Sequence, residues 1–168
     1  MKDYRGIGLV WILALFVGTP GLLAQSADDL PILEAVLRYE IGLSLRDSSP
    51  RTTGAERPFA FCVQIRSSAR SGPVDPDASL LARFRDDRPP VKPGSACDVR
   101  DWKVYDRSSG KPAVILDVGP VVRQRGSSKA EVSGAPYVGG QVARENLYRL
   151  KLRGKAWIVY DVRIKIVT

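Results

Sequence analysis

Two carboxylates stand out as candidate chemical groups because each interrupts an apolar run of the sequence. Glu40 lies in a helical pattern and Asp117 in a strand-like one. A buried acid beside a tyrosine, such as Tyr39, Tyr148 or Tyr160, could exchange protons with a substrate. Alternatively, each acid pairs with one of the many arginines. The residues themselves leave both interpretations open.

The chain contains no histidine, which removes the commonest general base and metal ligand. Ser-His-Asp and Cys-His arrangements are therefore excluded. The pair Gly139-Gly140 lacks the Lys-Ser/Thr that follows a phosphate-binding loop. Asp98, Asp101 and Asp106 do not have the spacing of a metal-binding loop. We predict no catalytic, cofactor-binding or metal-binding residues, and no cofactor.

The N-terminus has the parts of a secretory signal. Lys2 and Arg5 precede an uncharged apolar run from Ile7 to Val17, and Pro20 interrupts any helix before Ala24. A bilayer-spanning helix needs about 20 apolar residues, more than this run supplies. We expect residues 1–24 to be a cleaved signal peptide and 25–168 to be one domain. The mature chain should be periplasmic or secreted and have no membrane span.

Cys62 and Cys97 are the only cysteines. Two cysteines in an exported chain predict a disulfide, with two buried free thiols as the alternative. Closing a loop of about 36 residues would contribute about 3–4 kcal/mol in the chain-entropy model. Two thiolates without histidine cannot form a closed zinc site.

The charge balance is basic, with 26 Lys and Arg against 18 Asp and Glu and a net charge of +8. A basic surface favours anionic partners. The cations are spread along the chain, however, so composition alone does not identify a binding face.

Periodicity predicts the elements that must position these groups. A helix from Asp28 to about Leu45 precedes a strand, Phe59 to Ile65, whose odd-numbered residues share one face. A short helix from Ala78 to Phe84 and an irregular proline-rich loop from Asp86 to Ala96 follow.

The remaining chain reads as strands separated by short turns, which indicates an antiparallel meander. The predicted class is α+β, with a curved antiparallel sheet of about five or six strands packed against the N-terminal helix and a short second helix. The expected strands are Val99 to Tyr105, Ala113 to Val122, Lys129 to Val138, Gln141 to Leu152 and Ala156 to Val167.

The last two strands alternate between apolar and basic residues. In the final strand we expect the apolar face to cover the helix; it comprises Ala156, Ile158, Tyr160, Val162, Ile164 and Ile166. The opposite face carries a basic stripe, Arg149, Lys151, Arg163 and Lys165. This stripe is a candidate surface for an anionic polymer or surface, or an ordinary solvated sheet face.

The order of elements resembles the cone-shaped fold of the nuclear transport factor 2-like superfamily, in an exported, functionally uncharacterised bacterial branch. The segments that carry the resemblance are 118–120, 130–134, 137–140, 148–150 and Gly154-Lys155-Ala156-Trp157-Ile158-Val159. The superfamily includes isomerases, dehydratases and non-catalytic binding or dimerisation modules. Its enzymes often use a histidine–aspartate pair, which this chain lacks.

These observations predict an exported non-catalytic module that binds an unknown small ligand or protein partner. One alternative is a lyase- or isomerase-type enzyme that uses a pocket carboxylate and a tyrosine. Another is an envelope protein that binds polyanions through the basic stripe. Homodimerisation stays open.

Overall fold

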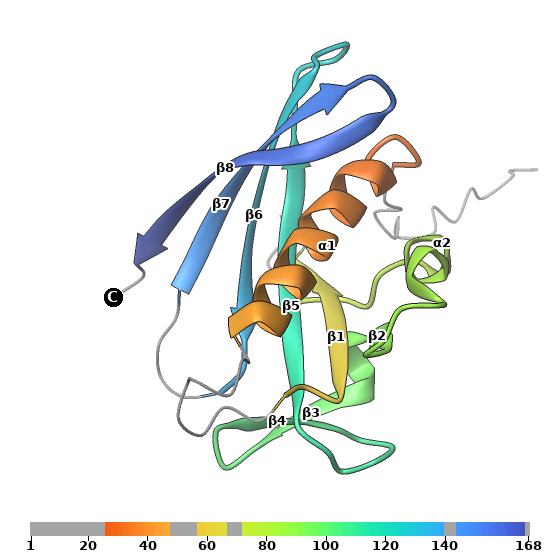
Figure 1. Cartoon of the computed structure of the whole chain (residues 1–168), viewed down its shortest axis with the longest axis vertical. Helices are drawn as coiled ribbons and strands as arrows, with labels where there is room; N and C mark the ends of the chain where they lie inside the picture. The colour runs from red at the N-terminus through yellow and green to blue at the C-terminus, as the bar shows by residue number, and fades with distance from the viewer. Residues whose placement is uncertain (1–25, 48–56, 67–71, 140–143, 167–168) are drawn as a thin grey trace, which may run out of the picture.

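A curved sheet and a long helix dominate the structure, a computed structural model that describes residues 26–47, 57–66, 72–139 and 144–166 (Figure 1). The helical elements are α1 (Leu30–Asp47), α2 (Ala78–Leu81) and the 3-10 turns η1 (Ala82–Phe84) and η2 (Gly94–Ala96). The strands are β1 (Ala60–Ile65), β2 (Val91–Pro93), β3 (Cys97–Arg100), β4 (Lys103–Asp106), β5 (Ala113–Val122), β6 (Lys129–Tyr137), β7 (Arg144–Arg153) and β8 (Ala156–Ile166).

The main sheet is mixed, with the strand order β2-β1-β5-β6-β7-β8. Strands β5 to β8 form the expected antiparallel meander, whereas β2, β1 and β5 run parallel. The predicted α+β class, with its N-terminal helix and short second helix, is confirmed. The long segment between β1 and β5 is what allows parallel pairing, because a crossover needs a dozen residues or more.

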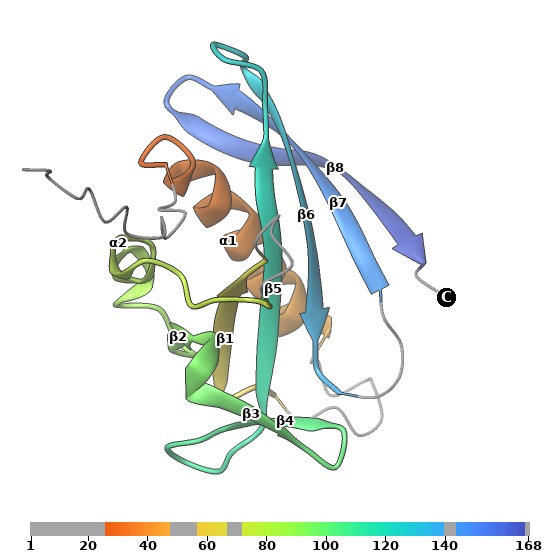
Figure 2. The ribbon, with the colours of Figure 1, turned by 180° about the vertical axis from the view of Figure 1, so that it is seen from behind.

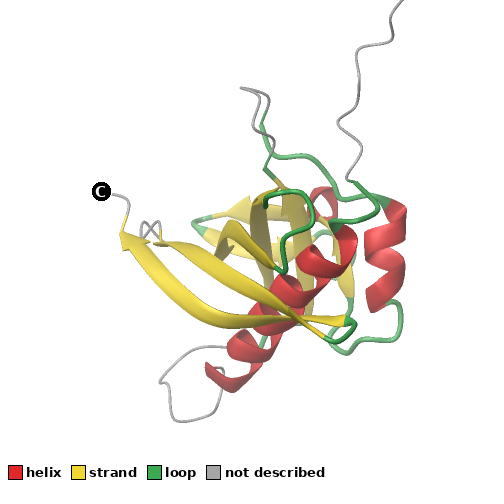
Figure 3. Cartoon of the chain, turned by 90° about the horizontal axis from the view of Figure 1, so that it is seen from above, coloured by secondary structure: helices red, strands yellow, loops and turns green. Residues whose placement is uncertain are grey.

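The helix α1 covers one face of the sheet, as the view from above shows (Figure 3). Its buried residues Val36 and Leu37 meet Phe61 and Val63 of β1 in the main hydrophobic core. The other face of β1 is also covered, because Cys62 belongs to a second core beneath β3 and β4. Strand β1 is thus buried on both faces.

Two expectations about the middle of the chain are wrong. Residues 99–105 form a hairpin of β3 and β4 rather than one strand, with a two-residue turn at Asp101 and Trp102. No glycine or proline marks this turn, so the sequence pattern did not indicate that the strand ends there. The loop expected over residues 86–96 contains β2, which pairs with β1 at the sheet edge, where prolines are tolerated.

The face expected to cover the helix in β8 is partly wrong. Trp157, Val159 and Val162 pack against the main core, whereas Tyr160 and Ile164 are 46% and 55% exposed. Of the three residues that pack there, only Val162 was expected, whereas both exposed residues, Tyr160 and Ile164, had been expected to cover the helix.

The cause is an irregularity in the pairing of β7 with β8. Arg149 is opposite Asp161 and Leu150 is opposite Val159, so Tyr160 is an extra residue. Because side chains alternate along a strand, the extra residue puts Trp157 and Val159, which precede it, on the same face as Val162, which follows it. Ile164 shares the face of Val162 but is exposed, which the bulge does not explain.

None of the helices in the described part of the chain has the length and apolar composition needed to cross a bilayer. The predicted signal peptide, residues 1–24, and its cleavage site lie outside the described residues.

Candidate functional site

The predicted disulfide is present. Cys62 of β1 and Cys97 of β3 are bonded, and both are buried in the second core. The bond ties the β3–β4 hairpin to the main sheet, so a structural role accounts for both cysteines.

Glu40 points inward and meets a tyrosine, as one sequence interpretation predicted. It lies on α1 and is 3% exposed, and Tyr148 of β7 is fully buried. The Tyr148 hydroxyl donates a hydrogen bond to Glu40 Oε1. Asn146 Nδ2 donates to Tyr148 Oη at 2.9 Å, and Tyr39 packs edge-on to the Tyr148 ring. We call Glu40, Asn146 and Tyr148 the interior cluster.

The interior cluster is arranged to satisfy a buried carboxylate. Burial raises the pKa of Tyr148 well above its usual range, and the negative charge of Glu40 raises it further. Tyr148 therefore stays protonated and acts as a donor. A buried carboxylate is costly unless it is hydrogen-bonded, and Tyr148 supplies such a bond.

Asp117 follows the alternative interpretation and pairs with an arginine. Arg66, just after β1, places Nη2 3.1 Å from Asp117 Oδ2 and Nη1 2.6 Å from Glu145 Oε1. Burial alone would lower the pKa of Arg66, but the hydrogen bonds that it donates to these two carboxylates outweigh burial and raise the pKa. Tyr160 lies elsewhere, beneath Lys151 Nζ. The structure thus brings Glu40 and Tyr148 together but not Asp117 and a tyrosine.

The basic stripe is partly neutralised by carboxylates on β6 and β8. Arg149 Nε lies 2.9 Å from Glu131 Oε1, and its Nη1 lies 3.5 Å from Asp161 Oδ2. Arg163 also contacts Asp161, at 3.5 Å. The stripe is therefore a mixed-charge surface and not a row of free cations.

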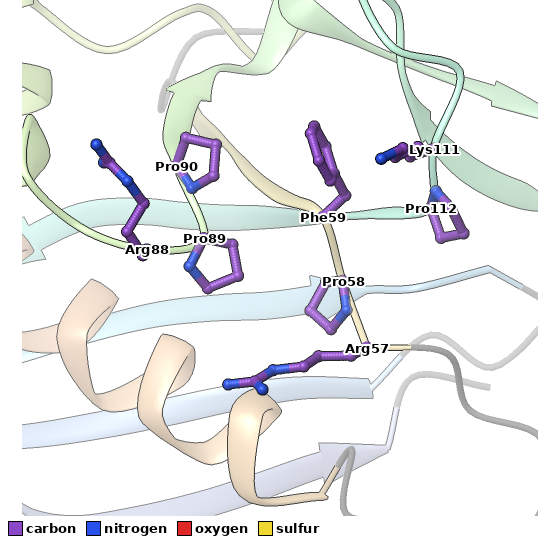
Figure 4. Close-up of a pocket in the computed structure, with 8 residues that line it drawn as sticks. All are labelled: Arg57, Pro58, Phe59, Arg88, Pro89, Pro90, Lys111 and Pro112. Atoms are coloured by element: carbon purple, nitrogen blue, oxygen red, sulfur yellow. The ribbon is translucent and has the colours of Figure 1, made fainter.

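A different group of cations surrounds a hollow that the sequence interpretation missed. Each parallel strand of the sheet is preceded by a cation followed by proline: Arg57-Pro58 before β1, Arg88-Pro89-Pro90 before β2, and Lys111-Pro112 before β5. With Phe59 they line an open hollow of about 530 Å³ (Figure 4). We call it the basic-proline pocket.

The backbone at the basic-proline pocket is already hydrogen-bonded. The N–H groups of Phe59 and Phe61 donate to the carbonyls of Pro112 and Pro90, at 2.8 and 3.0 Å. Proline has no N–H, so the cationic side chains are the main donors left for a ligand. The residue before a proline is restricted to extended backbone, which helps to fix where each cation begins.

The three cations of the pocket are exposed, and none forms an ion pair with a carboxylate of the described residues. Lys111 Nζ lies 4.5 Å from the centre of the Phe59 ring, which is 38% exposed. Arg88 Nη1 donates only to the backbone carbonyl of Asp87, at 2.8 Å. The pocket therefore offers positive charge next to an apolar floor.

The repeated basic-proline dipeptide was the available signal for this pocket. It is visible in the sequence, but the dipeptides are separated by tens of residues. Only the parallel pairing of β2, β1 and β5 brings them to one end of the sheet.

Comparison with family models, curated proteins and solved structures gives no match for this chain.

Proposed function

We propose that the protein is an exported, non-catalytic module that binds an anionic ligand in the basic-proline pocket. The observation that carries the proposal is that Arg57, Arg88 and Lys111 all line one hollow and that none has a carboxylate partner among the described residues. Cations without a carboxylate partner favour an anionic ligand.

Other arginines of the chain, unlike the pocket cations, form ion pairs with carboxylates. Arg38 contacts Glu34 and Asp87, and Arg66 contacts Asp117 and Glu145. The exposed cations of the pocket are thus available for phosphate, sulfate or carboxylate groups, which arginine binds with charge-assisted hydrogen bonds.

The apolar lining narrows the ligand class. Phe59 and the prolines supply apolar contact area. The prolines have no N–H group to donate to a ligand. Sites for small organic ligands combine apolar walls with a few placed polar groups. We therefore infer an anion attached to an apolar or aromatic body. Membership of the nuclear transport factor 2-like superfamily and export through residues 1–24 belong to the same proposal.

Calorimetric titration with phenyl phosphate tests the proposal. The double variant Arg88→Gln/Lys111→Gln should bind at least about tenfold more weakly, because each charge-assisted hydrogen bond contributes about 1.5–3 kcal/mol. Binding to the wild type should weaken as salt is raised. The control is Arg163→Gln/Lys165→Gln, which removes two cations from the basic stripe and should bind like wild type. Equal affinities for wild type and the pocket variant would refute the pocket.

The lyase- or isomerase-type alternative is favoured by one observation, the hydrogen bond between Tyr148 and Glu40. None of the interior cluster lines the basic-proline pocket. An enzyme of this kind would need a path that admits a substrate to Glu40. Measurable turnover of any carbonyl substrate by wild type, abolished in Glu40→Gln at unchanged stability, would establish it over the binding module.

A further inference from the structure

The end of the molecule that carries the basic-proline pocket also presents an exposed tryptophan. The β3–β4 hairpin lies at the same end as the starts of β1 and β5 in both side views (Figures 1 and 2). Trp102 occupies the turn of this hairpin and is 65% exposed. An apolar ring of this size at a protruding turn calls for an explanation.

The backbone holds Trp102 in place. Asp101 and Trp102 both have left-handed backbone, with φ of 48° and 63°. Lys103 bridges to Gly139 after β6, and a Cβ at residue 139 would lie 2.1 Å from the Trp102 carbonyl oxygen. Only glycine allows this approach. The Cys62–Cys97 bond anchors the base of the hairpin, so the ring is presented by a well-supported turn.

The surroundings of Trp102 combine apolar and cationic side chains. Val99 and Val138 are 48% and 62% exposed. Arg100 and Lys103 face each other across the hairpin on either side of the turn. Tryptophan with flanking cations is typical of groups that sit at the membrane–water interface, where the ring lies at headgroup level and the cations meet phosphates.

The positive excess of this end comes from the pocket. Within the hairpin, Asp98 pairs with Arg100 at 3.1 Å, and the formal charges of Asp101 and Lys103 cancel in the count. Arg57, Arg88 and Lys111 have no such partner among the described residues. Charge complementarity therefore favours an anionic surface, to which each nearby cation adds attraction.

A membrane surface fits this end better than a protein partner. A stable protein interface buries about 800 Å² on each side, whereas the exposed apolar side chains around the turn are one indole ring and two valines. Interfacial insertion requires only a few apolar side chains when cations assist. We infer that this end of the protein docks on an anionic lipid bilayer, with Trp102 entering the interface and the pocket cations facing lipid phosphates. The electrostatic attraction in this inference rests on the proposed anion pocket, whereas the insertion of Trp102 does not.

The test uses the exported protein, purified from the extracytoplasmic fraction, and vesicles of phosphatidylcholine with or without phosphatidylglycerol. Wild type should float with the anionic vesicles only, and less so as salt is raised. Trp102→Asn should bind about tenfold more weakly, because it removes a large apolar side chain while asparagine tolerates the left-handed backbone. Its affinity for phenyl phosphate should equal that of wild type.

Tyr160→Asn is the matched control. Tyr160 is 46% exposed and also lies beneath a lysine, with Lys151 Nζ 5.1 Å from its ring centre, but it belongs to β8. This variant should bind vesicles like wild type. An equal loss in both variants would overturn the assignment to the hairpin.

The remaining outcomes separate the two proposals. Wild-type binding to neutral and anionic vesicles alike, or full binding by Trp102→Asn, would overturn membrane docking. Retention on an anionic polysaccharide that does not depend on Trp102, without vesicle binding, would replace the bilayer by a soluble polyanion. If Arg88→Gln/Lys111→Gln keeps its phenyl phosphate affinity while Trp102→Asn loses vesicle binding, the anion pocket fails and docking by the hairpin stands.

Discussion

The interior cluster and the basic-proline pocket are two groups of polar side chains that the fold treats in opposite ways. In the interior cluster, Tyr148 donates to Glu40 and Asn146 donates to Tyr148, all inside the core. In the pocket, the side chains of Arg57 and Lys111 are exposed, and neither meets a carboxylate of the described residues.

This difference shows that the requirements of folding explain the interior cluster but not the pocket cations. A buried charge must be hydrogen-bonded, or the folded state loses several kcal/mol. The interior cluster therefore follows from burial and needs no ligand. Exposed cations have no such requirement, so burial does not explain why three of them line one hollow. Function is better sought at the pocket.

The largest expected effect concerns the interior cluster. Tyr148→Ala should lower the free energy of unfolding by about 3–5 kcal/mol, because it empties a fully buried aromatic site. Tyr148→Phe should cost about 1–3 kcal/mol by leaving the Glu40 carboxylate without this donor. Denaturant unfolding measures both. Loss of phenyl phosphate binding in folded Tyr148→Phe would contradict the division between the two groups.

The disulfide, which supports the hairpin beside the pocket, should have the next effect. Cys62→Ala/Cys97→Ala opens a loop with a sequence separation of 35 and should cost about 3–4 kcal/mol in the chain-entropy model. Reductant should destabilise wild type by a similar amount in denaturant unfolding and leave the variant unchanged. A variant as stable as wild type would show that packing alone holds the hairpin.

Asp106 provides a third, pH-dependent comparison. Burial alone would raise its pKa, but hydrogen bonds from Lys92, Ser109 and Ser108 outweigh burial and hold the pKa well below its usual range. The contribution of ionised Asp106 to the free energy of unfolding is therefore fully present above the unfolded-state pKa of about 3.9. It is lost as the pH falls toward the lower pKa of the folded state.

Asp106→Asn should therefore be less stable than wild type by about 1–3 kcal/mol at neutral pH. The gap in denaturant midpoint should narrow as pH is lowered below about 4. Asp98→Asn, on an exposed pair with Arg100, is the control and should cost less than about 1 kcal/mol. A difference in denaturant midpoint between wild type and Asp106→Asn that widens in acid would contradict a lowered pKa of Asp106 in the folded protein.

The smallest effect on stability should come from the pocket cations. Arg57→Gln, Arg88→Gln and Lys111→Gln should each change the free energy of unfolding by no more than about 0.5 kcal/mol, because none has a described carboxylate partner. Arg66→Gln is the matched comparison, since it leaves Asp117 and Glu145 without their arginine. Thermal or chemical unfolding should rank Arg66→Gln as the most destabilising of the four.

Local patterns in the sequence were sufficient for several elements. The strand predicted from Ala113 to Val122 has the bounds of β5, and the helix predicted from Asp28 overlaps α1 closely. Helical spacing also put Glu40 within the apolar pattern of the helix, although it left open whether Glu40 meets a tyrosine or an arginine, and the cysteine pair predicted the disulfide. Each of these depends on neighbours in the chain or on residue type alone.

Long-range pairing decided the rest. Tyr148 lies 108 residues from Glu40, so no local pattern could choose it over Tyr39 or Tyr160 as the hydrogen-bond donor. The bulge at Tyr160 appears only when β8 is aligned with β7, and it reverses the face of the residues before it. A period-2 pattern read from sequence assumes an unbroken strand.

The sequence by itself determined the α+β class, the antiparallel order of the last four strands and the paired cysteines. The tertiary structure alone decided that β2, β1 and β5 run parallel, which gathers three basic-proline dipeptides into one pocket. The physical reason is that periodicity reports which face of an element is buried, whereas a binding site depends on which distant elements become neighbours.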